Sequence, residues 1–286
     1  MVNYKGFQND EEWLNFRASY FTASEIYKLL SEPKISAADR ETANFEKLLS
    51  VGAKSYVSDC VAEMLSPPEP QYYNSAMERG NEVEPRVAER IAKELGKTIN
   101  DDDFIYTSVG ERIFFYNDEY NLGSTPDVII LNKMICEVKC PKSKTHLKYL
   151  MIKSVEDFFK VSKDESPSSK DSLKKHYGQM QLNMFLTNTD KCLFVSFDDR
   201  FFNPEHHYHS VLIPRDEEYI KKLLEKSKYG KEYKEQILKT INEKSCQPKK
   251  SRIKASSENK QTSFTGTTSS QRSTTKKIIT DSGSGI

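Results

Sequence analysis

The chain has 286 residues, of which 36% are hydrophobic and 30% charged, and its formal net charge is +1. A chain of this length can bury a sizeable core, and its near-neutral charge excludes a broadly basic protein that coats nucleic acid. The charge is uneven, because residues 247–286 carry +6 and residues 1–246 therefore carry −5 of the total of +1. An acidic body with a basic tail fits a localised nucleic-acid groove rather than a basic surface.

No apolar run approaches the roughly 18 residues of a membrane span, and the N-terminus has no signal-peptide pattern. We therefore expect an intracellular protein without a membrane partner, which would be nuclear if the host is eukaryotic. The five cysteines are scattered and odd in number, which indicates thiols in a reducing compartment. Since an iron–sulfur cluster needs four suitably placed cysteines, none is expected.

Residues 10–31 are predicted to form two helices that meet around Arg17. Thr22 or Ser24 can cap the second helix. A helix N-terminus beside an arginine makes a ready phosphate-binding pocket. An ordinary capped helix with a solvated arginine fits the same residues. Further helices are predicted over 36–65.

A helix predicted over about 74–95 carries a glutamate on its apolar face. The apolar stripe runs from Val87 to Leu95, and Glu84 falls on that stripe at helical spacing. A glutamate on the inward face needs a partner. Pro85 predicts that the helix either restarts or kinks at this point.

Strand patterns at 103–108 and 112–116 lead into GSTPDVIILNKMICEVKCP, residues 123–141. Two strand-like runs in this stretch flank Asn132-Lys133, a plausible hairpin turn. Because strand side chains alternate between faces, pairing can bring Asp127, Glu137 and Lys139 together at one rim of the sheet. Such charges are costly to bury among Val, Ile and Cys unless they pair or bind a metal.

Two carboxylates and a backbone carbonyl, here that of Val138, suit Mg²⁺, with Mn²⁺ as a possible substitute. Such an ion can generate a hydroxide and stabilise the leaving alkoxide when a phosphodiester is hydrolysed. Lys139 would orient or help deprotonate the attacking water. A surface ion pair is the alternative on this pattern alone, since 30% of the chain is charged.

The polar stretch 153–174 is predicted to form a helix and a mobile loop, and a helix with a core stripe follows over about 172–187. Gln179 and Gln181 flank that stripe and, two residues apart, cannot face the same point. Strands at 192–197 and 207–213 then precede a charged helix over 216–242.

The histidines at 206, 207 and 209 lack Cys or carboxylates at ligand spacing, so an exposed strand edge is favoured over a zinc site. After Cys246 the Ser/Thr/Lys-rich composition predicts disorder.

The chain thus has a helix with Glu84, then strands with Asp127, Glu137 and Lys139, and then a helix with Gln179. In this order of elements it resembles the PD-(D/E)xK nucleases, specifically the branch of phage lambda exonuclease and the YqaJ-type viral recombinases. The matching segments are FRASYFTASEIYKLLSEP (16–33), GNEVEP (80–85), GSTPD (123–127), CEVKCP (136–141), HYGQMQLNMFLT (176–187) and HYHSVLIPRDEEYI (207–220). The resemblance implies an α/β nuclease domain over 1–246. This domain would have a restriction-endonuclease-like core, a mixed central β-sheet flanked by helices, and N-terminal helices. Residues 247–286 would be a disordered basic tail.

The resemblance also implies roles for matching residues. Asp127 and Glu137 match the metal-binding acids and Lys139 the catalytic lysine. Glu84 matches the helix glutamate that completes the metal shell, together with the Val138 carbonyl. Gln179 matches the glutamine that helps to position the nucleophile, and Gln181 is the less favoured candidate for that role.

A further group, Arg17, Ser24 and Thr125, matches residues that hold the 5′-terminal phosphate of the shortened strand. His176 stands where lambda exonuclease carries a tyrosine, a departure that bears on how the water is positioned.

The implied function is metal-dependent 5′→3′ exonucleolysis of linear double-stranded DNA, in recombination, repair or the replication of a virus or mobile element. Family enzymes can form a homotrimeric ring, and a single-strand annealing protein is a candidate partner. Two alternatives stay open: a structure-specific or nicking endonuclease of the same fold, and a catalytically silent DNA-binding recombination module.

Overall fold

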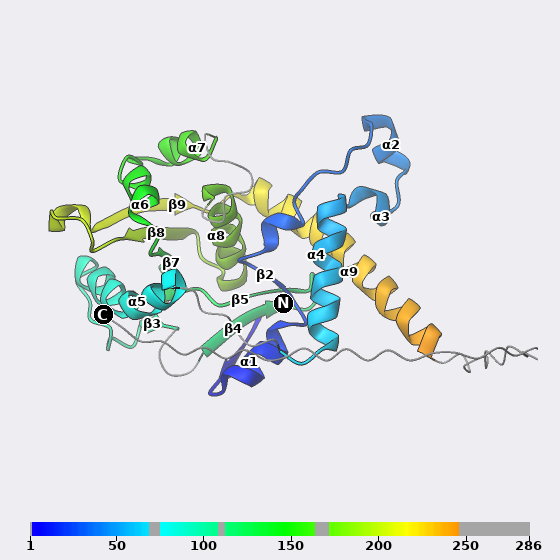
Figure 1. Ribbon diagram of the computed structural model, residues 1–286, viewed down its shortest axis with the longest axis horizontal. Helices are drawn as coiled ribbons and strands as arrows, with labels where there is room; N and C mark the ends of the chain where they lie inside the picture. Colours follow the sequence, from blue (N-terminus) through cyan, green and yellow to red (C-terminus); the bar gives the residue numbers. More distant parts are fainter. Residues whose placement is uncertain (1, 69–74, 108–111, 164–171, 246–286) are drawn as a thin grey trace, which may run out of the picture. The chain divides into compact units, whose positions relative to one another are not determined.

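The structure is a computed structural model that describes residues 2–68, 75–107, 112–163 and 172–245. These residues belong to a compact unit that spans Met1–Cys246 (Figure 1). The predicted disordered tail, 247–286, and most of the loop predicted before residue 172 lie outside the described residues. Within the described ranges, no helix is both long and apolar enough to cross a membrane.

A strand and a helix open the chain. β1 (Asn3–Phe7) is followed by α1 (Asp10–Arg17), the first of the two helices predicted around Arg17. The side chain of Asn9 accepts a hydrogen bond from the backbone N–H of Glu11 at 2.7 Å and caps α1.

The second helix predicted in this region is wrong. The chain instead forms a short strand, β2 (Phe21–Thr22), and a 3₁₀ turn, η1 (Ile26–Lys28), that no side chain caps. Neither Thr22 nor Ser24 therefore caps a helix beside Arg17. The reason is tertiary: β2 pairs in parallel with β5 (Leu122–Ser124), about 100 residues away, and the Phe21 side chain is fully buried in a core cluster that includes Tyr56 and Leu122.

Residues 36–65 form the predicted helices, divided into three by capping side chains at Ser36, Asn44 and Ser50. They are α2 (Ala37–Thr42), α3 (Phe45–Leu48) and α4 (Val51–Leu65). The next helix, α5 (Ser75–Glu94), contains Pro85 within it, so the helix does not restart at the proline.

The strands form two sheets. The central sheet has the order β3-β6-β7-β8-β9, in which β7 and β8 are parallel and the other pairs antiparallel, so it is the predicted mixed sheet. Its strands are β3 (Phe104–Tyr106), β6 (Val128–Ile130), β7 (Met134–Lys139), β8 (Lys191–Phe197) and β9 (Tyr208–Pro214).

The N-terminal sheet, which the sequence did not separate from the central one, has the order β1-β4-β5-β2. In it, β4 (Arg112–Asn117) pairs with both β1 and β5. Gly123 of β5 lies against the ring of Phe114, where an added Cβ would collide, so this position requires glycine.

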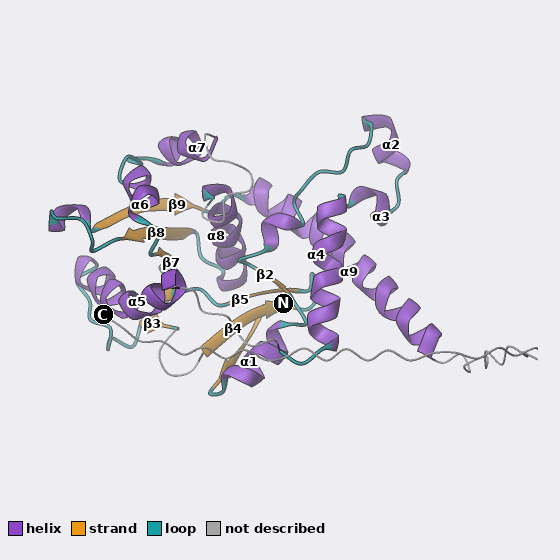
Figure 2. Cartoon of the chain, in the orientation of Figure 1, coloured by secondary structure: helices purple, strands orange, loops and turns teal. Residues whose placement is uncertain are grey.

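Helical layers cover both faces of the central sheet (Figure 2). On one face Val87 and Ile91 of α5 pack with Cys136 and Val138 of β7. On the other face Ile135 packs with residues of three helices, α6 (Ser143–Tyr149), α7 (Val155–Lys163) and α8 (Leu173–Thr187). Because side chains alternate along β7, Glu137 and Lys139 share the face of Ile135, towards α8.

The last elements are a 3₁₀ turn, η2 (Pro204–His206), and the long helix α9 (Glu217–Ser245), which packs on α3, α4 and α8. The predicted α/β fold class is thus confirmed, with the second sheet as an addition.

Candidate active site

The predicted hairpin is present. β6 and β7 are antiparallel, with Val128 opposite Cys136 and Ile129 opposite Ile135. The turn contains Asn132 at φ 58°, a left-handed conformation that asparagine tolerates. One step beyond β6, the same register places Asp127 opposite Glu137.

The three charged residues of the hairpin lie together. The backbone N–H of Val138 donates to Asp127 Oδ2 at 2.7 Å, and Lys139 Nζ forms an ion pair with Glu137 Oε1. The Glu137 side chain is fully buried, whereas that of Lys139 is 23% exposed. Local alternation thus gathers two acids and one ammonium at the end of β7, where Lys139 reaches solvent.

The electrostatics of this group are unbalanced. Burial, and next the charge of Asp127, raise the pKa of Glu137 to about 8. Burial also raises the pKa of Asp127, against the opposing effects of Lys139 and the Val138 N–H. Burial disfavours the charged form of Lys139, but its two carboxylate neighbours raise its pKa overall. One ammonium does not neutralise the fully buried Glu137 and the half-buried Asp127, and a bound cation would favour the ionised forms of both acids.

Glu84 approaches the same group from α5, the layer on the opposite face of the sheet. Its side chain is half-buried, and its charge raises the pKa values of Glu137, Lys139 and Cys140. Glu84 therefore lies near the end of β7, within electrostatic reach of the hairpin acids.

Helix α8 contributes a residue that sequence reasoning missed. The fully buried Asn183 donates from Nδ2 to Glu137 Oε2 at 3.1 Å. His176, seven residues earlier on the same helix face, is also buried, and burial followed by the charge of Lys139 lowers its pKa. Gln179 lies between them, three residues after His176 and four before Asn183, so it shares the face directed at the hairpin. The signal for Asn183 was this i, i+4 spacing from Gln179.

Gln181 has a different position. It is fully buried, donates from Nε2 to the Pro214 carbonyl at 2.9 Å and accepts from the Asp216 N–H at 2.8 Å. These bonds join α8 to the start of α9. The structure therefore gives Gln181 hydrogen-bond partners away from the hairpin, whereas helical spacing places Gln179 on the face of His176 and Asn183.

The donor set at the hairpin fits a hard cation. The oxygens of Asp127 and Glu137 and the Val138 carbonyl are all of the type that Mg²⁺ prefers. Within the part of the chain that the structure describes, no group of three His, Cys, Asp or Glu side chains is gathered closely enough to hold a metal by itself. Mg²⁺ is commonly held by only one or two carboxylates, with water and substrate phosphates supplying the remaining ligands, so this arrangement is compatible with it.

The histidines near β9 serve a different purpose. His207 Nε2 lies 2.6 Å from the Phe201 carbonyl, and His209 Nε2 lies 2.6 Å from the Ile152 carbonyl. Both are half-buried on the edge strand or just before it, whereas His206 is exposed. The exposed strand edge expected for the three histidines is therefore found only at His206, because His207 and His209 are half-buried and bound to carbonyl oxygens.

The predicted phosphate-binding residues are partly brought together. Arg17 stacks on Trp13, with 4.7 Å between the guanidinium carbon and the ring centroid, and Trp13 Nε1 donates to Thr125 Oγ1 at 3.4 Å. The parallel register of β2 and β5 places Thr22 opposite Gly123, so Ser24 and Thr125 follow from the ends of neighbouring strands. Trp13 is thus a second residue that sequence reasoning missed.

Arg17 lines a cavity of about 280 Å³ between α1 and the end of α4, together with Thr22, Glu63 and Ser66. Ser24 and Thr125 do not line this cavity. Burial lowers the pKa of Arg17, which Glu63 opposes, and no ion pair to Arg17 occurs among the described residues. A partly buried guanidinium without a carboxylate partner is suited to an anion.

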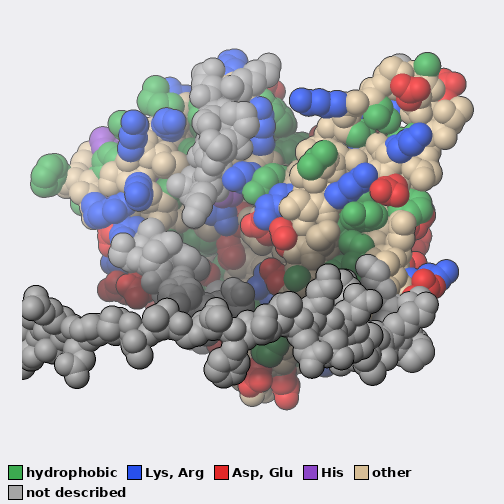
Figure 3. Space-filling view, turned by 45° about the vertical axis from the view of Figure 1, so that its right-hand side comes forward, with side chains coloured by type: hydrophobic (Ala, Val, Ile, Leu, Met, Phe, Trp, Pro, Cys, Tyr) green, Lys and Arg blue, Asp and Glu red, His purple; other side chains and the backbone are tan. Residues whose placement is uncertain are grey.

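Basic side chains are dispersed over the visible surface. On the face drawn in Figure 3, Lys and Arg lie among acidic side chains and form no single continuous patch. This distribution agrees with the negative charge of residues 1–246 and favours local anion-binding sites over a broad basic surface.

A mixed sheet whose central hairpin ends in two acids and a lysine defines a protein of the PD-(D/E)xK class. The comparison with family models makes this more specific: the chain belongs to the family of the YqaJ-like viral recombinase domain, whose model matches residues 12–190. None of the curated proteins compared with the chain matches it significantly.

Solved structures share the fold. The crystal structure of LHK-Exo in complex with dAMP is 23% identical with a TM-score of 0.58, over 82% of this chain and 97% of that chain. A second structure of LHK-Exo, an alkaline exonuclease from Laribacter hongkongensis, is 21% identical with a TM-score of 0.56, over 82% and 97%. A phage-related exonuclease from Haemophilus somnus 129PT is 20% identical with a TM-score of 0.57, over 78% and 96%.

Proposed function

We propose that this protein is a Mg²⁺-dependent deoxyribonuclease that degrades linear double-stranded DNA from 5′ ends, in recombination or a related process. The observation that carries the proposal is the group of Asp127, Glu137 and Lys139 at the end of β7, in a chain that belongs to the YqaJ-like viral recombinase family. The exonuclease names of the structural relatives, one of them bound to dAMP, support DNA as the substrate. We further propose that residues 1–246 form the nuclease domain and 247–286 a basic tail.

The roles of the residues follow from their positions. Asp127, Glu137 and the Val138 carbonyl would hold the ion, and Glu84 would complete the shell from α5. When bound, Mg²⁺ would lower the pKa of water and polarise the scissile phosphate. Lys139, partly exposed at the end of β7, would orient the water and stabilise the charge that develops on phosphate. Asn183 would hold the orientation of Glu137 through its hydrogen bond, and Gln179, on the same face of α8, would help to position the nucleophile.

The 5′→3′ polarity rests on the second group. Arg17 stacks on Trp13, and Trp13 donates to Thr125, which lies two residues before Asp127 in the chain. A terminal phosphate held there would place the first phosphodiester bond near the hairpin acids. The homotrimer and the annealing-protein partner extend the proposal by family resemblance.

The experiment that tests the proposal compares Lys139→Ala with Lys133→Ala on linear duplex DNA with Mg²⁺. Both lysines belong to the same hairpin, but Lys133 is exposed in the turn. We expect Lys139→Ala to lower turnover by about 10²–10³, the loss typical of one transition-state charge stabiliser. The turnover of Lys133→Ala should stay within twofold of that of the wild type. Full activity of Lys139→Ala would overturn the proposed site.

A further inference from the structure

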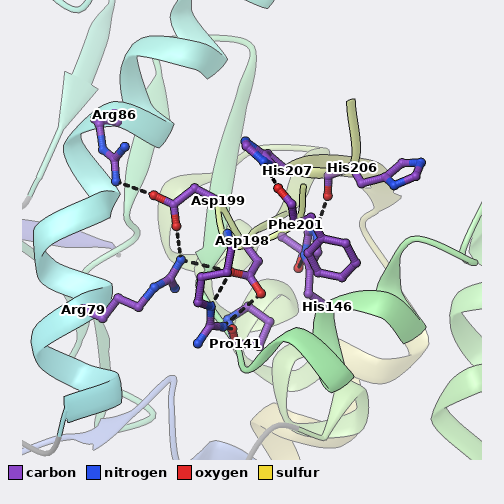
Figure 4. Close-up of polar contacts among 11 residues, drawn as sticks. Arg79, Arg86, Pro141, His146, Asp198, Asp199, Phe201, His206 and His207 are labelled. Carbon is purple, nitrogen blue, oxygen red and sulfur yellow. Dashed lines mark hydrogen bonds and ion pairs between the residues drawn. The ribbon is translucent and has the colours of Figure 1, made fainter. Parts of the chain in front are cut away.

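A cluster of ion pairs lies where β8 ends, beside the N-terminal half of α5 (Figure 4). Arg79 Nη2 contacts Asp198 Oδ1 at 3.1 Å and Asp199 Oδ1 at 2.5 Å. Arg86 Nη2 contacts the other oxygen of Asp199, Oδ2, at 2.7 Å. Both arginines belong to α5, the helix that carries Glu84, so the carboxylates of the β8 end hold that helix at two points.

The carboxylate side of this cluster is itself anchored. Asp198 is fully buried, and it accepts from Arg200 Nε at 2.6 Å and Nη2 at 2.9 Å. Arg200 Nη2 also donates to the Pro141 carbonyl at 2.9 Å, two residues after Lys139. The backbone N–H of Asp198 donates to the His207 carbonyl at 2.8 Å. The cluster thus joins the end of β7, the end of β8 and α5.

These contacts act on the rotation of α5. Arg79 and Arg86 are seven residues apart, so they share one flank of the helix about 10.5 Å apart along its axis. Glu84 lies between them in sequence, on the side that carries Val87 and Ile91 towards the sheet. Two anchors on one flank fix both the rotation and the axial position of the segment that presents Glu84.

Apolar packing holds α5 at Val83, Val87 and Ile91, but the side chains described before Val83 include no buried apolar residue. An added Cβ at Gly80 would meet no atom within 4 Å, and the neighbouring Asn81 and Glu82 are exposed. The buried apolar residues described in α5 begin only at Val83. Glu84 must moreover reach the hairpin acids from the layer opposite α8, so a small turn of α5 would withdraw it.

We propose that Asp198 and Asp199 are positioning residues that, through Arg79 and Arg86, hold Glu84 beside the hairpin acids. The inference rests on the proposed function, because it concerns the metal shell that Glu84 would complete. Neither aspartate would touch the substrate or the ion. Residues that orient metal ligands typically contribute about 10–100-fold to metal affinity or activity.

The test is a titration of the purified protein with Mn²⁺ in the absence of DNA, so that no turnover takes place. The heat of binding is measured by isothermal titration calorimetry. Asp198 is fully buried between two arginines, and its removal would threaten the fold. The variants are therefore Asp199→Asn and Arg86→Gln, each also combined with Glu84→Gln. Thermal unfolding verifies that each variant is folded.

A matched control is available on the same helix. Arg90 is 54% exposed, like Arg86 at 56%, but its partner at 3.1 Å is Glu94, one turn further along α5. Arg90→Gln removes a similar ion pair, and with it the contact of the Arg90 guanidinium over the Tyr208 ring of β9 at 5.6 Å, but it leaves the contacts between α5 and the end of β8 in place.

We expect Asp199→Asn and Arg86→Gln to weaken Mn²⁺ binding roughly tenfold, and Arg90→Gln to change it less than twofold. In the Glu84→Gln background, Asp199→Asn should have no further effect, because the residue it positions is gone. An equal loss in that background, an equal loss in Arg90→Gln, or no loss in the first two variants would overturn the inference. Failure of the wild type to bind Mn²⁺ would instead overturn the proposed function.

Discussion

The two glutamines of α8 offer a contrast that separates a structural role from a functional one. Gln181→Met removes the donor to the Pro214 carbonyl and the acceptor for the Asp216 N–H, in a side chain that is fully buried. Each buried group left without a partner costs about 1–3 kcal/mol, so the loss of both partners should lower the free energy of unfolding by about 2–6 kcal/mol. For a domain of this size, about 2–4 °C per kcal/mol corresponds to a drop of about 4–24 °C in Tm.

Gln179→Met is the matched substitution on the same helix. Gln179 is half-buried, and no hydrogen bond joins its side chain to another described residue, so its Tm should change by less than about 3 °C. Its turnover on DNA should fall at least tenfold, because it shares the helix face of His176 and Asn183.

The assay is differential scanning calorimetry for both variants, with DNA hydrolysis measured at a temperature where both are folded. Gln181→Met should keep most of the wild-type turnover under these conditions. A stable but inactive Gln181→Met together with an unstable but active Gln179→Met would refute the assignment of the two side chains.

Three further predictions concern the acids and the phosphate group. Ca²⁺, used instead of Mg²⁺ to avoid turnover, should raise the free energy of unfolding of the wild type by about 2.7 kcal/mol at 100 times its Kd, as measured by urea unfolding. Asp127→Asn should abolish this increase. The same increase in Asp127→Asn as in the wild type would contradict the metal site. Arg17→Ala should slow cleavage at 5′-phosphorylated ends at least about tenfold more than at 5′-hydroxyl ends, because a charge-assisted contact is lost only with the former; an equal loss on both in single-turnover assays would contradict the phosphate role. Because folding raises the pKa of Glu137 from 4.5 to about 8, its buried acid form favours the fold at low pH. The free energy of unfolding of the metal-free wild type, relative to that of Glu137→Gln, should therefore fall as the pH rises from 5 to 8. Urea titrations at several pH values measure this difference, and a difference that rises with pH would contradict the prediction.

Local patterns were sufficient for the hairpin and for α8. Alternation along 127–139 predicted that Asp127, Glu137 and Lys139 share a rim, because a two-strand hairpin with a short turn leaves little freedom of register. The 3.6-residue spacing of α8 likewise predicted its buried stripe, which the structure confirms at Tyr177 and Met180. Both features depend on residues close in sequence.

Features that depend on distant partners were not predictable. The segment after Arg17 has the composition of a capped helix, yet Phe21 is drawn into a strand by β5, about 100 residues away. In the sequence, Asn183 is one polar residue within a helix, and its role follows only from the fold, which places Glu137 of β7 against it. The ion pairs of Asp198 and Asp199 with α5 span about 120 residues, and charged residues after a strand ordinarily indicate a solvated loop.

The most direct measurement uses purified protein with Mg²⁺ on two substrates, 5′-phosphorylated linear duplex DNA and covalently closed circular DNA, with Lys139→Ala alongside. The account predicts release of mononucleotides from the linear duplex, no change in the circle, and loss of release in Lys139→Ala. Nicking of the circle would contradict the exonuclease assignment while leaving the hairpin site intact. DNA binding without cleavage of either substrate would contradict the account as a whole.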